Sequence, residues 1–280
     1  MRAILFLLLI PCLSFAQDLA EKLQNLSVTV HAADGAQGSG VLITRDGKNY
    51  VLTAAHVIDG GREVLEFTDN STGLNKKFTR FKMVRIVREI IQDGRSIGKM
   101  TIEADVVAYS SADFGDDLAL LKLRYPIAPA SVVFYKGEAI PSTGSPIFHV
   151  GSFLGQDGSN SYSEGKISQV GRVLKEANDK VFDQSSATAF PGSSGGGMFN
   201  AQGEYIGTLV RGAGETFNLY VPVRRIRDWA KRHGVEFIFD ETAKVDETKV
   251  VLEGLEPKAY GYGKSTEQQW KYLIRIGDNF

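Results

Sequence analysis

A histidine, an aspartate and a serine stand in three short motifs, and together their side chains could carry out nucleophilic attack on an acyl carbon. The motifs are TAAH, which ends at His56, DLALL, which begins at Asp117, and GSSGG, which is centred on Ser194. A serine hydroxyl is a weak nucleophile until an imidazole takes its proton, and a carboxylate holds that imidazole in the right tautomer. We therefore predict Ser194 as the nucleophile, His56 as the base and Asp117 as the acid that orients the base.

Glycines around the serine predict a second part of the same machinery. Because glycine lets the main chain bend sharply, the N–H groups of Gly192 and Ser194 can converge on a carbonyl oxygen as it becomes negative. We expect these two donors to form an oxyanion hole.

The three motifs resemble those of the trypsin-like serine peptidases, which share the chymotrypsin fold and the order His, Asp, Ser. The flanking sequence is similar to the bacterial HtrA/Deg branch, because Pro191 precedes the glycine, YIG follows at 205–207 and YVPV at 220–223. The likeness covers roughly residues 26–233. It implies an all-β fold of two antiparallel six-stranded β-barrels with a C-terminal helix.

The resemblance also assigns the acid and the substrate pocket. Asp113 and Asp116 compete with Asp117, but only Asp117 is followed by the Leu-Ala-Leu-Leu of the family pattern. The residues implied as substrate-binding are Thr188, Phe190, Thr208, Leu209, Val210, Arg211 and Gly212. Thr188 stands at the base of the implied pocket, where enzymes specific for Lys or Arg carry an acid. Burying a cation there would be costly, so a small or medium apolar side chain is expected. Arg211 either attracts acidic side chains or faces solvent.

Short apolar segments separated by turns, with no alternation of strands and helices, independently predict antiparallel barrels. Asp46-Gly47 indicates a tight hairpin. For barrel one, about 26–125, strands are expected at 26–31, 41–44, 50–52, 63–67, 78–87, 100–109 and 118–123. For barrel two, about 130–223, they are expected at 146–150, 165–174, 181–187, 197–199, 205–211 and 217–223. Residues 223–233 carry an amphipathic helical pattern.

The ends of the chain differ from this middle part. Residues 1–16 contain a short apolar block and read as a signal peptide cleaved near Ala16, which predicts a secreted or periplasmic protein with a peptidase domain at 17–240. Cys12 is the only cysteine, and Pro11 before it disfavours a lipoprotein signal. The tail at 241–280 is too short for a PDZ domain, and we expect it to pack on the barrels or to contact a partner.

Composition excludes several other functions. The formal net charge is −1, so no overall field for nucleic acid or for stable membrane insertion follows. Without a mature cysteine or paired histidines no metal site is expected, and no cofactor is implied. The segment 76–99 is locally basic and is either a solvated hairpin or a docking surface for an acidic partner. Ordering of the polar stretches 152–163 and 175–184 is expected to control activity.

The sequence therefore predicts an exported serine endopeptidase that hydrolyses protein or peptide substrates through an acyl-enzyme. The sequence is also compatible with an oligomer. A catalytically silent, protease-like binding module and an esterase using the same triad are the alternatives.

Overall fold

Two closed β-barrels form the molecule, and the catalytic motifs of the sequence lie at the ends of their strands. The computed structural model describes residues 11–68, 70, 73, 75–137, 141–153, 160–245, 251, 252, 272 and 273. Barrel one has the strand order β1-β2-β3-β8-β7-β6, and barrel two has the order β10-β11-β14-β13-β12-β9. All neighbouring strands within them are antiparallel. The expected pair of six-stranded antiparallel barrels is confirmed.

The bounds of the barrel strands follow the apolar segments of the sequence. Barrel one is built from β1 (Ser27–His31), β2 (Gln37–Arg45), β3 (Lys48–Thr53), β6 (Val84–Gln92), β7 (Arg95–Ser110) and β8 (Leu118–Leu123). Barrel two is built from β9 (Pro146–Ser152), β10 (Asn160–Leu174), β11 (Lys180–Ser185), β12 (Gly197–Phe199), β13 (Tyr205–Gly212) and β14 (Asn218–Pro222).

The turn between β2 and β3 shows how local chemistry sets the register of barrel one. Arg45 pairs with Lys48, so Asp46 and Gly47 alone form the loop, and both have positive φ, at 49° and 70°. Two residues with positive φ are the mark of a type I′ turn, whose twist matches that of the flanking strands. The hairpin expected from Asp-Gly is confirmed, and it directs β3 toward His56.

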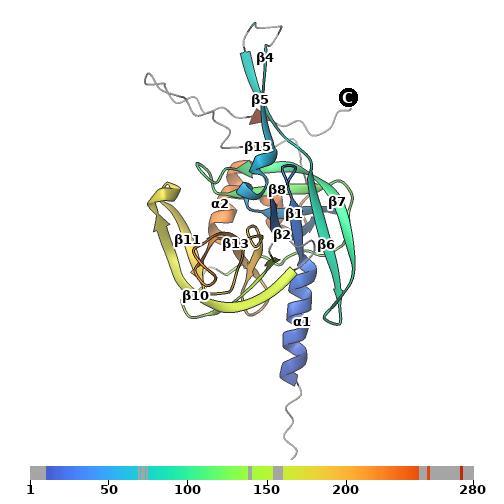
Figure 1. The fold of residues 1–280 in the computed structure, drawn as a ribbon, viewed down its shortest axis with the longest axis vertical. Helices are drawn as coiled ribbons and strands as arrows, with labels where there is room; N and C mark the ends of the chain where they lie inside the picture. Colours follow the sequence, from blue (N-terminus) through green and yellow to red (C-terminus); the bar gives the residue numbers. More distant parts are fainter. Residues whose placement is uncertain are drawn as a thin grey trace, which may run out of the picture.

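A separate two-stranded ribbon corrects part of the prediction for barrel one. β4 (Arg62–Thr68) and β5 (Asn75–Phe81) pair only with each other, so the expectation that 63–67 belongs to the barrel was wrong. The stretch 78–87 is also two strands, β5 and β6. The reason is that β1 pairs directly with β6, through Thr29 opposite Val87, and this closes the barrel without a free edge for the ribbon. The ribbon projects from the barrels on the side away from helix α1 (Figure 1).

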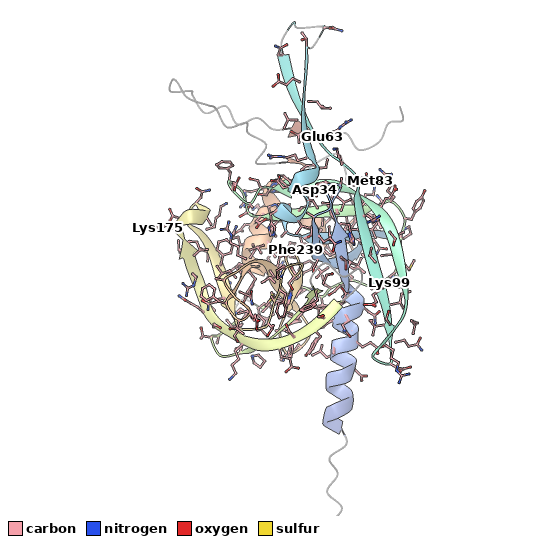
Figure 2. The ribbon with its side chains drawn as sticks, in the orientation of Figure 1. Asp34, Glu63, Met83, Lys99, Lys175 and Phe239 are labelled. Carbon is pink, nitrogen blue, oxygen red and sulfur yellow. The ribbon has the colours of Figure 1, made fainter. Side chains whose placement is uncertain are left out.

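The basic segment at 76–99 is thereby spread over this ribbon and the β6–β7 hairpin, which lie on different parts of the molecule. Figure 2 places Glu63 on the ribbon and Lys99 on the far hairpin. On the ribbon, Glu63 accepts from Arg80 Nε at 2.8 Å and also pairs with Lys82. Several of the basic side chains are therefore engaged within the protein.

Two helices pack against the barrels, and α1 projects from them (Figure 1). α1 (Pro11–Leu26) overlaps the expected signal peptide, and its Leu23 and Leu26 are buried. α2 (Val223–His233) buries Ile226, Trp229 and Ala230 and ends at Gly234, whose φ of 69° provides the left-handed cap. Short 3-10 turns are η1 (Ala55–Val57), η2 (Asp59–Gly61), η3 (Lys175–Ala177) and η4 (Glu236–Phe239).

The tail beyond 240 is described only in part. β15 (Val251–Leu252) pairs with β16 (Tyr272–Leu273), and residues 246–250, 253–271 and 274–280 lie outside the described residues. The expectation that the tail packs on the barrels or contacts a partner therefore falls mostly outside them. The same holds for 154–159 within the stretch 152–163.

Candidate active site

His56 and Asp117 meet at the surface where barrel one faces barrel two. His56 lies in η1, directly after β3, and Asp117 immediately precedes β8, which is paired with β3. Both carboxylate oxygens of Asp117 lie 3.0 Å from His56 Nδ1, and Oδ1 also accepts from the main-chain N–H of His56 at 3.0 Å. Because an ionised carboxylate can only accept, Nδ1 carries the proton and the lone pair is left on Nε2. This is the tautomer that a general base for a serine requires.

The pKa of His56 follows from its surroundings. Burial lowers it, but the hydrogen bond and the charge of Asp117 outweigh burial, so the pKa is raised above its ordinary value of 6.5. Arg211 acts to lower this pKa and Asp59 to raise it. Since the side chain of His56 is 36% exposed while that of Asp117 is 5% exposed, the acid is enclosed and the base is open to substrate.

The predicted oxyanion donors lie in a tight turn ahead of β12. Ser193 N donates to Phe190 O at 2.9 Å, Pro191 is the second residue of the turn, and Gly192 is the third with φ at 100°. This combination is typical of a type II turn, which requires a positive φ at its third residue. Among the described residues, no acceptor lies within hydrogen-bonding distance of Gly192 N or Ser194 N. Both donors are therefore left for a ligand.

Close packing brings the Ser194 segment to barrel one. A Cβ on Gly195 would lie 2.1 Å from Ser39 O and 2.3 Å from Thr53 Oγ1, so only glycine permits this approach. Thr53 is three residues before His56. Within the described part of the chain, Ser194 Oγ makes no hydrogen bond, and the hydroxyl lines a cleft of about 360 Å³.

Ser39 is a site residue that sequence reasoning missed. Its main-chain N donates to Ser194 O at 2.7 Å, and its Oγ donates to Gly192 O at 2.7 Å and accepts from Ser152 N at 2.7 Å. One buried serine of barrel one thus fixes the main chain on both sides of Ser193. The available signal was its Gly38-Ser39-Gly40 setting inside a strand, because glycine in a strand often marks a close approach of another backbone.

The residues expected to bind substrate divide into two groups. Phe190, Leu209, Arg211 and Gly212 line the cleft beside Ser194. Thr188 instead lines a second cavity of about 340 Å³, which it shares with His149 and Phe190. Thr208 and Val210 are buried, and Thr208 Oγ1 is hydrogen-bonded to Tyr205 Oη. Ala189 and Pro191, from the wall expected at 188–191, also line the cleft, and the cleft residues that sequence reasoning did not name are Gly214, Glu215 and Asn218.

The cleft carries charges of both signs at its edge. Arg211 is half-buried, whereas Glu215 is exposed. In the part of the chain that the structure describes, no carboxylate lies within 4.0 Å of the Arg211 guanidinium, which instead lies over the ring of Phe182 at 6.0 Å. Arg211 is thus available to a ligand.

The competing acids play other parts. The Asp116 carboxylate is buried and binds Arg225, Lys180 and Arg232. The main-chain carbonyl of Asp113 accepts from Asn178 at 2.7 Å. His149 is buried, its Nδ1 lies 3.1 Å from Gly197 O, and burial lowers its pKa to about 4.

Two further observations concern the described residues alone. Within these ranges no three His, Cys, Asp or Glu side chains are grouped so that they could hold a metal ion. No helix in this part of the chain combines the length and apolar character needed to span a bilayer.

With this geometry established, comparison with known proteins decides the family. The sequence profile of the trypsin-like peptidase domain matches residues 38–207. The chain belongs to the trypsin-like peptidases. Within that family the branch it resembles is HtrA/Deg.

The individual relatives agree with this assignment. The chain is 31% identical over 170 residues to the DegP-like periplasmic serine endoprotease of Halomonas elongata, a match that covers 61% of this chain and 28% of that protein. It is 27% identical over 175 residues to the Do-like serine protease HtrA of Lactobacillus helveticus, covering 61% and 35%. In fold it is similar to the crystal structure of Deg5, with a TM-score of 0.56, 21% identity and coverage of 84% and 99%. The matches span about a third of the length of the curated relatives.

Proposed function

We propose that this protein is an exported serine endopeptidase that cleaves protein or peptide substrates through Ser194, His56 and Asp117. The observation that carries the proposal is the enclosed carboxylate of Asp117 on Nδ1 of His56, at 3.0 Å, together with the close packing of Gly195, the residue after Ser194, against Thr53. A structural ion pair would not need a histidine whose side chain is 36% exposed.

In the proposed mechanism, Ser194 Oγ attacks the carbonyl carbon of the substrate as His56 Nε2 takes the hydroxyl proton. The carbonyl oxygen becomes negative and accepts from the N–H groups of Gly192 and Ser194. Asp117 stabilises the resulting imidazolium, which then gives its proton to the leaving amine. The acyl group stays on Ser194 until water, activated by His56, hydrolyses the ester and restores the enzyme.

Apo geometry is consistent with this sequence of steps. The Ser194 hydroxyl has no hydrogen-bond partner among the described residues, and catalytic hydrogen bonds are often long until substrate is bound. The open turn at Gly192 needs no rearrangement to present its N–H. The proposal requires that the Ser194 hydroxyl and His56 Nε2 come within hydrogen-bonding distance once substrate fills the cleft.

For the substrate, we propose a small or medium apolar side chain next to the scissile bond, with Arg211 favouring an acidic side chain nearby. Leu209 and Phe190 provide apolar lining, and Arg211 provides the unpaired cation. Export is proposed with cleavage near Ala16, in keeping with periplasmic location in the name of the Halomonas relative. Residues 17–26 would then remain as the C-terminal part of α1, in which Leu23 and Leu26 are buried.

The test is mass spectrometry of a broad peptide library after incubation with residues 17–280, beside the Ser194→Ala variant. Cleavage by the unsubstituted protein alone supports the proposal, and the cleaved sequences report the cleft preference. Equal cleavage by both proteins would refute the assignment of Ser194. Dominant Lys or Arg before the scissile bond would refute the proposed pocket chemistry, and rapid turnover of esters without peptide cleavage would favour an esterase.

A further inference from the structure

The residue before the proposed triad acid is held from the other barrel. Arg225 on α2 donates from Nε to Asp116 Oδ1 at 2.9 Å and from Nη2 to the main-chain carbonyl of Asp116 at 3.1 Å. One guanidinium thus binds both the side chain and the backbone of Asp116, the residue before Asp117. Arg225 and Asp116 are 109 positions apart in the sequence.

The guanidinium itself is fixed by barrel two. Arg225 Nη1 donates to Val181 O on β11 at 3.0 Å, and the charged group lies over the Phe182 ring at 4.7 Å. Its side chain is only 11% exposed. Because Arg225 is immobilised by α2 and β11, it holds Asp116 in a position that barrel two determines.

The bond to the backbone acts directly on the conformation of Asp117. The peptide group between Asp116 and Asp117 is bound at both ends, since its oxygen accepts from Arg225 and its N–H donates to Ser111 O at 3.2 Å. Asp117 has a φ of 58°, in the left-handed region that a non-glycine residue keeps only when its surroundings enforce it. Fixing that peptide plane fixes the direction in which the Asp117 carboxylate leaves the chain.

Charge supports the same arrangement. The Asp116 carboxylate is 3% exposed and lies next to a second anion, Asp117. Burial raises the pKa of Asp116, but the charges of Arg225 and Lys180 outweigh burial, and the pKa is lowered. Arg232 is the third cation on this carboxylate.

We propose that Arg225, acting through Asp116, is a positioning residue for the catalytic acid Asp117. This inference rests on the proposed triad. It gives barrel two, which supplies the nucleophile, a means of aligning the acid of barrel one. The contacts made by Asp116 then belong to catalysis as well as to stability.

Arg224 supplies a matched control. It is the neighbouring residue on α2 and binds Asp183, which is 1% exposed, through two hydrogen bonds of 2.8 and 2.6 Å. Asp183 belongs to β11, so both partners of this pair belong to barrel two and its closing helix. Losing the Arg224 pair removes another contact between α2 and β11, one that does not include Asp116 or Asp117.

The experiment measures kcat, KM and the pH profile of kcat/KM for peptide cleavage, together with urea unfolding. The charged groups that shift the pKa of His56 are Asp117, Arg211 and Asp59. Those that lower the pKa of Asp116 are Arg225, Lys180 and Arg232. For Arg225→Met we expect kcat to fall by about 10–100-fold with KM within about twofold, as for an interaction used mainly in the transition state. The acid limb of the profile should move to higher pH, because the less compensated Asp116 anion stabilises the His56 imidazolium.

Companion variants separate geometry from charge. Arg225→Lys keeps the positive charge, but one ammonium group cannot bind both the carboxylate and the main-chain carbonyl of Asp116. We therefore expect kcat to fall while the acid limb of the pH profile stays at the same pH. Asp116→Asn removes a negative charge and leaves the neighbouring cations less compensated. The His56 imidazolium is then less favourable, so the acid limb of the pH profile should move to lower pH. Arg224→Met should lower the urea midpoint while kcat and the limb stay as in the unsubstituted protein. If Arg225→Met does not fold, Arg225→Lys and Asp116→Asn carry the test.

Two outcomes overturn different statements. Equal kcat and equal pH profiles for the Arg225 and Arg224 variants would overturn the positioning role, provided that Asp117→Asn still abolishes most activity. Full activity of Asp117→Asn would instead overturn the triad on which the inference rests. The positioning role of Arg225 is supported if the acid limb moves to higher pH in Arg225→Met and to lower pH in Asp116→Asn, while kcat and the acid limb of Arg224→Met stay as in the unsubstituted protein.

Discussion

Ser39→Ala removes one hydroxyl that joins barrel one to the nucleophile turn. The lost Oγ leaves Gly192 O without its donor and Ser152 N without its acceptor. A buried polar group without a partner costs about 1–3 kcal/mol. Because Gly192 is half-buried and can be reached by water, while Ser152 is fully buried, we expect a loss of about 2–4 kcal/mol in the free energy of unfolding.

Activity should fall for a different reason. The freed carbonyl of Gly192 allows the turn to rotate, and its N–H is then no longer held toward the oxyanion. Removing an oxyanion donor outright costs about 10²–10³ in kcat, so loosening one should cost about 10–50-fold. KM should change little, because the side-chain hydrogen bonds of Ser39 go to Gly192 and Ser152 and not to the cleft walls at Leu209 and Arg211.

The assay is steady-state cleavage of a fluorogenic peptide, together with urea unfolding. Ser27→Ala is the matched control, because Ser27 is also fully buried and donates from Oγ to Leu23 O at 3.0 Å, at the junction of α1 and β1. It should lower stability and leave kcat intact. If Ser39→Ala loses stability but keeps full kcat, the hydroxyl only supports the fold and the reasoning about the turn is refuted.

Three further outcomes are expected. The value of kcat/KM should rise with pH through a midpoint above 6.5, since only neutral His56 acts as a base. In Asp117→Asn, the midpoint of any residual activity should lie at lower pH. A profile that is flat between about pH 5 and 9 would contradict the role of His56 as the base. The pair of protonated His56 with Asp117 also stabilises the fold. Because the pKa of His56 is raised on folding, this stabilisation is complete below the ordinary pKa of 6.5 and is lost as pH rises through the raised pKa of the folded protein. Trp229→Ala should cost about 3–5 kcal/mol in urea unfolding, because the indole is fully buried under α2, and a cost below about 1 kcal/mol would show that the helix packs elsewhere. Glu63→Gln on the exposed ribbon should leave both kcat and the unfolding midpoint unchanged, and a large change in either would show that the ribbon is coupled to the barrels.

Local patterns predicted the strands that form the barrel walls. The run Leu118–Leu123 matches β8 at both ends, because five of its six residues are buried and the segment is almost wholly apolar. Gly197–Phe199 matches β12 in the same way. The chemistry of a two-residue turn also fixed the approach of β3 to His56. Such signals arise within a few residues of one another.

The ribbon shows where periodicity stops being informative. Apolar Val64, Leu65 and Phe67 in the segment 63–67 indicate a strand, but the same composition serves a barrel strand and a free ribbon. What decides between them is that β1 reaches β6, with Val30 opposite Ile86. That pairing joins residues far apart in sequence and leaves no mark near residue 63.

The candidate site divides along the same line. The triad motifs could be read from the sequence because each side chain comes with its own strand end or turn. Ser39 and Arg225 could not, since their partners Gly192 and Asp116 are 153 and 109 positions away. Thr188 was expected at the base of the cleft and lies in the neighbouring cavity, where Phe190 separates the two spaces by lining both. Which wall a residue faces depends on packing that periodicity does not contain.

The left-handed backbone at Asp117 bears on how such a protein could change over evolutionary time. At a φ of 58° glycine fits without strain, and asparagine and aspartate tolerate the conformation better than other side chains do. A mutation of Asp117 to Asn or Gly therefore removes the acid while leaving the backbone satisfied. Alanine or a β-branched residue would remove the acid and strain the chain as well. Descendants that lose catalysis but keep the two barrels as a binding scaffold are thus expected to carry Asn or Gly at this position, and a survey of inactive relatives can look for that bias.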